Sequence, residues 1–295
     1  MSINSTVGIT ATQQYYTPSL GVTPSLGVSF SQSPTLSYAP LSGPGFLNSV
    51  LSPVQFNNIL VMSQSGWNPE LVLGICIQSI NDLMNAPTGS GPTPDTEPKY
   101  QDFKQFLTSY IYLNDHDLID IGMINRQGKA VREVHFQPTE DKQALVEMQT
   151  IRHLLNLNNS NQYAISTSGG MIIHNPTVWN VRLRSIYDMM SYLSQNIDIP
   201  AEHIQRNLVN STVTKDGKIF DWSETPAGAF FKIYSSSSKP DNARLSVYYL
   251  DNWFYLSNKD LKSQSSFMLL ALLFQAGESD SSTAGPVLTL PASGN

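Results

Sequence analysis

Charged residues and cysteine are both scarce in this sequence of 295 residues. Charged residues form 14% of the chain, well below the roughly 25% of typical soluble domains, whereas the hydrophobic fraction of 40% is enough for a sizeable core. The formal net charge of −6 disfavours nucleic acid as a partner, because binding to phosphate backbones requires clustered lysine and arginine. The single cysteine, Cys76, excludes a disulfide within the chain. No apolar run approaches the roughly 20 residues of a membrane-spanning helix, so none is predicted.

No Asp, Glu, Lys or Arg occurs before Glu70. This stretch contains aromatic residues among β-branched and small ones, which favours extended segments over a disordered coil. The hexapeptide TPSLGV of residues 17–22 is repeated at residues 23–28, and two copies are too few to indicate a solenoid. We therefore predict a charge-free, strand-like region over residues 1–50, which is ordered mainly by pairing with other strands of the protein or of a neighbour.

The segment that follows carries helix signals. Ser52 and Pro53 fit the start of a first helix that Gly66 closes, and Asn68 and Pro69 fit the start of a second helix. Together they predict a helical hairpin over residues 51–86. The apolar residues of the second helix follow the 3.6-residue period and are predicted to be buried: Val72, Ile75, Cys76, Ile80 and Leu83. Cys76 is therefore expected to be an inert, buried thiol.

Residues 87–98 are rich in Pro, Gly, Ser and Thr, which is typical of a linker or exposed loop. The only plausible domain boundary is placed there. It separates the helical hairpin from a domain over residues 99–277, which is followed by a C-terminal tail over residues 278–295.

Helices and strands alternate in this domain. Helices are predicted over residues 100–113, 139–155, 181–197 and 258–277. Thr139 is expected to cap the second of these helices, and Gly277 is expected to end the last. Strand pairs are predicted on either side of residues 126–128, 169–170, 216–217 and 251–252, with a further strand over residues 230–234. Hairpins interleaved with single helices imply an α+β fold in which an antiparallel sheet is covered by amphipathic helices.

Two of these helices carry an apolar stripe that is predicted to pack on the sheet around residues 245–256. Leu193 and Phe267 are expected to lie at the centre of these interfaces. The stripes consist of Val181, Ile186, Met189, Met190, Leu193 and Ile197 in one helix, and of Phe267, Leu270, Ala271 and Phe274 in the other.

No catalytic, metal or cofactor motif is recognisable. The five histidines lie in separate elements and never at the i, i+4 spacing of two ligands on one helix face. Neither a Gly-x-Ser-x-Gly elbow nor a phosphate loop is present. The best metal candidate, Asp115-His116-Asp117, is also typical of a polar turn between a helix and a strand. We therefore predict a non-enzymatic protein with no catalytic, cofactor-binding or metal-binding residues and no cofactor.

Aromatic residues cluster in the hairpin around residues 248–255. Strand alternation separates Tyr248 from Tyr249, so that one set faces the core and the other can form a stacking platform for sugars or bases. Core packing of the whole cluster is the alternative interpretation. The candidate interaction surface consists of Tyr15, Tyr16, Tyr248, Trp253 and Tyr255.

The text LSVYYLDNWFYL at residues 245–256, followed by DLKS at residues 260–263 and FMLL at residues 267–270, resembles a family of uncharacterised Gram-negative bacterial envelope proteins, often lipoproteins. The similarity extends to residues 34–40, 63–83, 182–196 and 286–291. Members of that family begin further upstream, with a signal peptide, a lipidated cysteine and a further helical segment. The resemblance implies a location at the periplasmic face of the envelope or outer membrane, and it supplies no catalytic residue.

Met1 is not followed by the basic and apolar segments of a signal peptide. The protein is therefore expected either to be cytoplasmic or, as the resemblance implies, to begin at an internal start without its membrane anchor. The leading hypothesis is a structural or scaffold protein of the envelope whose partners are other envelope proteins. The alternative is an envelope hydrolase or carbohydrate-binding module that uses Asp115, His116 and the aromatic hairpin.

Overall fold

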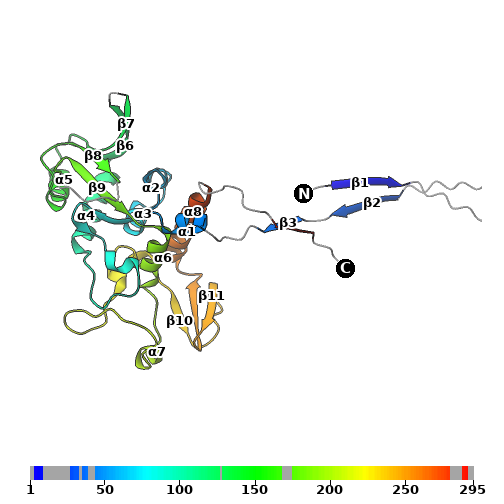
Figure 1. The fold of residues 1–295 in the computed structure, drawn as a ribbon. Helices are drawn as coiled ribbons and strands as arrows, with labels where there is room; N and C mark the ends of the chain where they lie inside the picture. Colours follow the sequence, from blue (N-terminus) through cyan, green and yellow to red (C-terminus); the bar gives the residue numbers. More distant parts are fainter. Residues whose placement is uncertain are drawn as a thin grey trace, which may run out of the picture. The chain divides into compact units, whose positions relative to one another are not determined.

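The protein is described by a computed structural model that covers residues 3–8, 27–32, 35–38, 44–126, 128–167, 175–279 and 288–291 (Figure 1). Contacts divide the chain into two compact units, residues 1–43 with 282–295 and residues 44–281. Helices and largely antiparallel sheets occur together, which confirms the predicted α+β class. No helix within the described residues combines the length and apolar character that crossing a membrane requires.

The first unit contains two short antiparallel ribbons. Strand β1 (Ile3–Gly8) pairs with β2 (Gly27–Gln32), and β3 (Thr35–Tyr38) pairs with β13 (Leu288–Pro291). The prediction of an extended region over residues 1–50 thus agrees with β1, β2 and β3, but it is wrong for residues 44–50, which are helical. Tyr15, Tyr16 and residues 17–26 of the repeated hexapeptides lie outside the described residues.

The larger unit is built on a six-stranded sheet. The strand order is β5 (Leu83–Met84), β4 (Ile77–Ile80), β9 (Val178–Leu183), β8 (Gln162–Ser166), β7 (Lys129–Phe136) and β6 (Ile119–Arg126). The neighbours are antiparallel, as predicted, except β8 and β9, which are parallel. The predicted hairpin at residues 169–170 lies outside the described residues.

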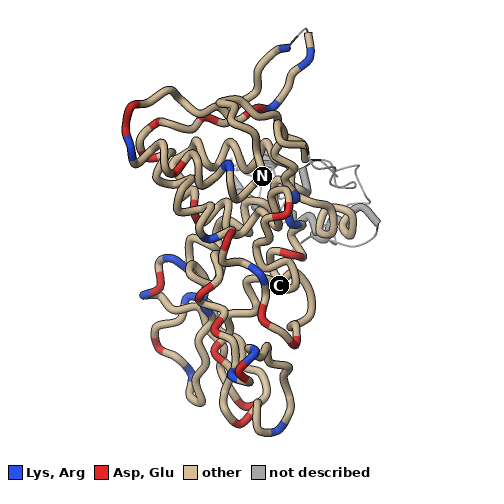
Figure 2. Tube along the Cα trace, turned by 90° about the vertical axis from the view of Figure 1, so that its left-hand side faces the viewer, with Lys and Arg blue, Asp and Glu red and all other residues tan. Residues whose placement is uncertain are grey.

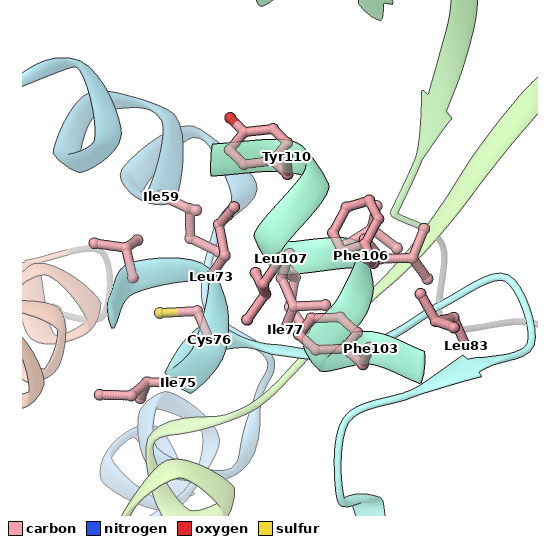
Figure 3. Packing of buried hydrophobic residues seen from close by; sticks show 14 of the residues in the cluster. Ile59, Leu73, Ile75, Cys76, Ile77, Leu83, Phe103, Phe106, Leu107 and Tyr110 are labelled. Atoms are coloured by element: carbon pink, nitrogen blue, oxygen red, sulfur yellow. The ribbon is translucent and has the colours of Figure 1, made fainter. Parts of the chain in front are cut away.

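Helices α2 (Phe56–Gln64), α3 (Pro69–Cys76), α4 (Gln101–Asp115) and α5 (Lys142–Leu154) accompany this sheet. Figure 3 shows Phe103, Phe106 and Leu107 of α4 reaching toward α3 and β4, where they form the centre of the core. The ring of Phe106 meets that of Trp179 on β9 edge to face, with centroids 5.7 Å apart. Packing of α4 against the sheet is therefore direct.

The helical hairpin is shorter than predicted. Asn68 caps α3 as expected, because its side chain accepts hydrogen bonds from the backbone N–H groups of Glu70 and Leu71. Helix α3 nevertheless ends at Cys76, since the next four residues pair with β9 as strand β4. The first helix begins at Phe56 and not near Ser52, because Pro53 is instead bridged to Ser185. All five apolar residues predicted to be buried are buried.

The predicted helix over residues 181–197 is wrong in its first part. Trp179, Val181 and Leu183 are buried at every second position, which is the pattern of strand β9. Helix α6 (Ile186–Ser194) begins only after Ser185, whose hydroxyl accepts from the N–H of Asp188 while the Asp188 carboxylate accepts from the N–H of Ser185. This reciprocal capping box fixes the start of the helix.

Residues 87–98, predicted as a linker, begin with a packed segment. Pro87–Ser90 form a 3-10 helix in which Gly89 and Ser90 are buried. A Cβ atom at Gly89 would lie 2.9 Å from the ring of Trp222, so only glycine fits this contact without displacement. At least the start of this stretch therefore belongs to the packed body of the larger unit.

A second, three-stranded sheet has the order β10 (Tyr234–Ser236), β12 (Asn252–Ser257) and β11 (Ala243–Tyr249). It lies at the opposite end of the larger unit from β6 and β7 (Figure 1). Leu250 and Asp251 form the two-residue turn between β11 and β12, both with positive φ. The strand predicted over residues 230–234 is displaced, because residues 228–230 form a 3-10 helix and pairing starts at Tyr234.

The last helix, α8 (Leu261–Ser279), runs beyond Gly277, and its inward face is rotated from the predicted one, so that Leu270 and Phe274 of the predicted stripe are only partly buried against the core. Leu269 and Leu273 are buried, whereas Phe267 is 42% exposed. Helix α6 packs against the 3-10 helix of residues 87–90, α1 (Pro44–Leu51), α8 and α3, and α8 packs against α1, α6 and the 3-10 helix of residues 228–230. Neither helix makes its main contacts with the three-stranded sheet, on which both were predicted to pack. The start of α5 also differs from the prediction, because Asp141 and not Thr139 caps this helix. Leu145 of α5 is exposed.

Candidate functional site

The structure places three of the candidate surface residues on one face of the three-stranded sheet. Tyr248 of β11 is paired with Trp253 of β12, and their ring centroids are 5.2 Å apart. Tyr255 is two residues further along β12, so it projects from the same face. Its cross-strand neighbour on β10 is Tyr234, at 5.8 Å between ring centroids. We call Tyr234, Tyr248, Trp253 and Tyr255 the aromatic face.

The aromatic face is not part of the core. Tyr248 is 55% exposed, and the other three side chains are partly exposed. The ammonium group of Lys239 lies 5.7 Å from the ring centroid of Trp253, and that of Lys232 lies 5.4 Å from the ring centroid of Tyr234. Cations at this distance are attracted by the ring quadrupole, which helps to hold the rings in place.

An open cavity of about 630 Å³ adjoins one end of the aromatic face. Tyr234 and Tyr255 form part of its wall, which also contains three lysines, one just before β10 and two around the start of α8: Lys232, Lys259 and Lys262. We call it the lysine pocket. Figure 2 shows that elsewhere positive and negative residues are interspersed along the chain.

Asp260 is the acidic residue in the wall of the lysine pocket. Its carboxylate accepts from the Ser263 hydroxyl at 2.6 Å, from the Ser263 N–H at 3.1 Å and from the Tyr234 hydroxyl at 3.1 Å. Partial desolvation opposes ionisation, but these bonds outweigh it and lower the pKa of Asp260. Desolvation and the neighbouring carboxylate raise the pKa of Tyr234, so the phenol remains a donor to Asp260.

The opposite face of the same sheet borders a larger cavity of about 740 Å³, whose wall includes Phe254, Leu250 and His203. The buried His203 places Nε2 2.9 Å from the carbonyl oxygen of Leu250, to which it donates. The neighbouring Asn252 donates to Glu202 at 2.7 Å. These bonds tie helix α7 (Ala201–Gln205) to the β11–β12 turn, and this structural role accounts for the buried imidazole.

Asp115 and His116 lie away from the aromatic face, at the turn between α4 and β6. His116 Nδ1 lies 2.7 Å from the carbonyl oxygen of Tyr112, and the two rings stack at 4.3 Å. Within the described residues, no contact joins this turn to the three-stranded sheet, and no three His, Cys, Asp or Glu side chains gather as metal ligands. The two halves of the predicted hydrolase site are therefore not brought together.

Sequence reasoning missed Tyr234 and the lysine pocket. The pocket is formed by residues that are 31 positions apart, as the bond from the Lys232 N–H to the Ser263 hydroxyl illustrates. Pairing of β10 with β12 brings these residues together. The strand was predicted over residues 230–234 and not over Tyr234–Ser236, so the sequence did not reveal this pairing. Comparison of the chain with protein-family models, curated proteins and solved structures finds no match.

Proposed function

We propose that this protein is a non-enzymatic scaffold or interaction protein of the bacterial envelope, and that strand β11 is its main protein-binding element. The observation that carries the proposal is the exposure of β11. It is an edge strand that pairs only with β12 among the described residues, and every residue from Arg244 to Tyr249 is exposed. A strand that is solvated on both faces and along one edge offers a partner backbone groups and side chains together.

The side chains of β11 favour an uncharged, extended partner segment. Leu245, Val247 and Tyr249 share one face and are 49%, 65% and 62% exposed. Arg244 is the only charged residue of the strand, so little repulsion or desolvation of charge opposes the addition of another strand. Exposed apolar residues that are contiguous in this way mark interaction surfaces.

The envelope location rests on the resemblance of residues 245–256 and 260–270 to envelope proteins. Other envelope proteins are the partners that this location implies, and an N-terminal anchor would supply membrane association. The charge-free ribbons β1–β2 and β3–β13 support an assembly role, because a two-stranded ribbon is marginal in water and gains stability from further strands.

Site-specific cross-linking in intact Gram-negative cells tests the proposal. A photoreactive residue in place of Val247 is expected to yield adducts with other envelope proteins. Val146 on α5 provides a matched control, because it is also an exposed valine, at 56%, but lies on a helix. Adducts of Val247 with cytosolic proteins alone, or equal adducts from both positions, would contradict the proposal.

The aromatic face favours a second candidate function, which is carbohydrate binding by the same sheet. Aromatic rings that lie side by side on an exposed sheet face suit the apolar faces of sugar rings. Carbohydrate binding at this surface involves no turnover of the glycan, and Asp115 and His116 lie away from it. Glycan hydrolysis that is lost in a His116→Ala variant would show that the chain is an enzyme and overturn both candidates.

A further inference from the structure

We propose that the aromatic face and the lysine pocket form one site for an acidic glycan, with sugar rings on the aromatic residues and an anionic substituent among the lysines. The inference rests on the second candidate function and specifies its ligand. The shared chemistry is a sugar chain bearing carboxylate or phosphate groups.

The aromatic face supplies an elongated platform. Trp253 and Tyr255 lie two positions apart on β12, which corresponds to about 6.6 Å along a strand. Each has a ring from a neighbouring strand beside it, Tyr248 and Tyr234 respectively. The platform therefore extends across three strands and accommodates more than one sugar residue.

The charges at the end of the platform select for an anion. The pocket wall contains three lysines, Lys232, Lys259 and Lys262, and one carboxylate, Asp260. Its side chains therefore carry an excess of two positive charges, in a chain whose formal net charge is −6. Among the described residues, no carboxylate lies within the 4.0 Å ion-pair distance of these three ammonium groups. Their electrostatic attraction is therefore available to a ligand.

The start of α8 is already compensated and does not itself form the anion site. Asp260 accepts from the Ser263 N–H, and the Lys262 N–H also bonds to this carboxylate. The anion must therefore be held by lysine side chains. Because flexible ammonium groups bind as point charges, carboxylate and phosphate substituents both satisfy the pocket.

A neutral glycan would leave the lysines unused, and the overall negative charge of the chain opposes binding of a long polyanion such as nucleic acid. An oligosaccharide with occasional anionic groups matches both parts of the site. Its binding is expected to weaken as salt is added, because the lysine contribution is screened.

Calorimetric titration of the full chain with four probes tests this inference. The probes are an oligogalacturonate for carboxylates, a pentamannose monophosphate for phosphates, neutral mannopentaose, and a single-stranded DNA oligomer. We expect at least one acidic sugar to bind about tenfold more tightly than mannopentaose, because its anionic group gains the electrostatic attraction of the lysines.

Three variants locate the site. The double change Lys259→Gln/Lys262→Gln is expected to reduce acidic-sugar affinity about tenfold, whereas Lys129→Gln/Lys142→Gln removes the same charge from β7 and α5 and should leave it unchanged. Trp253→Ala should abolish binding. Since Trp253 is partly buried, Tyr248→Ala, at a side chain that is 55% exposed, provides a second test that is less prone to unfold the sheet.

The outcomes separate this inference from the function on which it rests. Equal binding of acidic and neutral sugars, unaffected by the lysine changes but lost in Tyr248→Ala, overturns the acidic specificity and supports the carbohydrate platform. Binding of DNA alone, or of none of the four probes, overturns both.

Discussion

The guanidinium of Arg184 stacks on the ring of Tyr192, with its central carbon 4.1 Å from the ring centroid, at a place where both side chains are buried. Arg184 also donates to the hydroxyl of Ser90 at 2.9 Å and to the carbonyl oxygens of Ile75 at 3.2 Å, Ile77 at 2.6 Å and Asn85. Burial lowers the pKa of Arg184 to about 10, although the Tyr192 hydroxyl opposes this shift, so the side chain remains a cation at neutral pH. Carbonyl groups at the end of α3 take the place of a carboxylate partner.

Replacing Arg184 by Met is expected to destabilise the larger unit by about 3 kcal/mol or more, because several buried acceptors lose their donor at once. Arg184→Lys should also be strongly destabilising, since one ammonium group cannot reproduce the planar fork. Urea unfolding measures both effects. Arg182→Met, at an exposed position two residues earlier on strand β9, is the control and should change stability by less than about 0.5 kcal/mol. An unaltered unfolding midpoint for Arg184→Met would contradict the assigned role.

Cys76 is expected to be chemically inert in the folded protein. Its side chain is fully buried, and desolvation raises the pKa of the thiol to about 12 despite the nearby positive charge of Arg184. The reactive thiolate is therefore almost absent at pH 8. A chromogenic disulfide reagent should label less than a few per cent of the native protein within minutes but the whole population in urea. Rapid stoichiometric labelling without denaturant would show that the α3 core opens readily.

The inward face of α8 can be tested with two matched changes. Leu269→Asp places a carboxylate at a fully buried site and is expected to prevent cooperative folding, whereas Phe267→Asp lies at a side chain that is 42% exposed and should be tolerated with a loss of about 1 to 2 kcal/mol. Thermal unfolding monitored by circular dichroism distinguishes them. The reverse order of effects would restore the face that the sequence predicts.

The contrast at α8 illustrates how far local patterns reach. Residues 267–274 are apolar nearly without interruption, so periodicity cannot tell which side of the helix faces inward. The buried serines Ser263 and Ser266 belong to the inward face, but their burial depends on acceptors elsewhere, such as the Phe230 carbonyl that binds the Ser266 hydroxyl. Tertiary partners of this kind leave no mark in the local sequence.

The sequence did not predict strand β9 for a related reason. Val181 was assigned to the apolar stripe of Ile186 and Met189, although five residues correspond to about 140° around a helix, whereas it fits the two-residue alternation with Trp179 and Leu183. Parallel pairing with β8 and antiparallel pairing with β4 decide between these alternatives, and both are long-range. The hairpins β6–β7 and β11–β12 were predictable because their turns are local and carry Gly, Asp or Asn. The aromatic face was partly predictable for the same reason, since it is centred on one of these hairpins. The same signal at residues 216–217 predicted a strand pair wrongly, because the residues beside that turn form only the isolated bridge between Val213 and Ile219.

Acid should destabilise the protein partly through Asp260. Partial burial raises the pKa of this carboxyl, but the bonds from Ser263, Tyr234 and the Lys262 N–H more than compensate, so its pKa in the folded state is lowered below the ordinary 3.8. A carboxyl with a lowered pKa stabilises the folded state at pH values above the unfolded pKa, and this contribution is lost as the pH falls through the folded value. The Asp260→Asn variant can still accept one N–H bond, but its amide nitrogen accepts no bond from the Ser263 or Tyr234 hydroxyl. It should therefore be less stable than the natural protein at pH 7, and the difference should shrink toward zero near pH 2.

Urea unfolding of both proteins at the two pH values measures this change. Asp115→Asn removes an exposed carboxylate from the end of α4 and is expected to alter stability at pH 7 by less than about 0.5 kcal/mol. A difference between Asp260→Asn and the natural protein that stays constant from pH 7 to pH 2 would mean that the ionised carboxylate does not stabilise the start of α8.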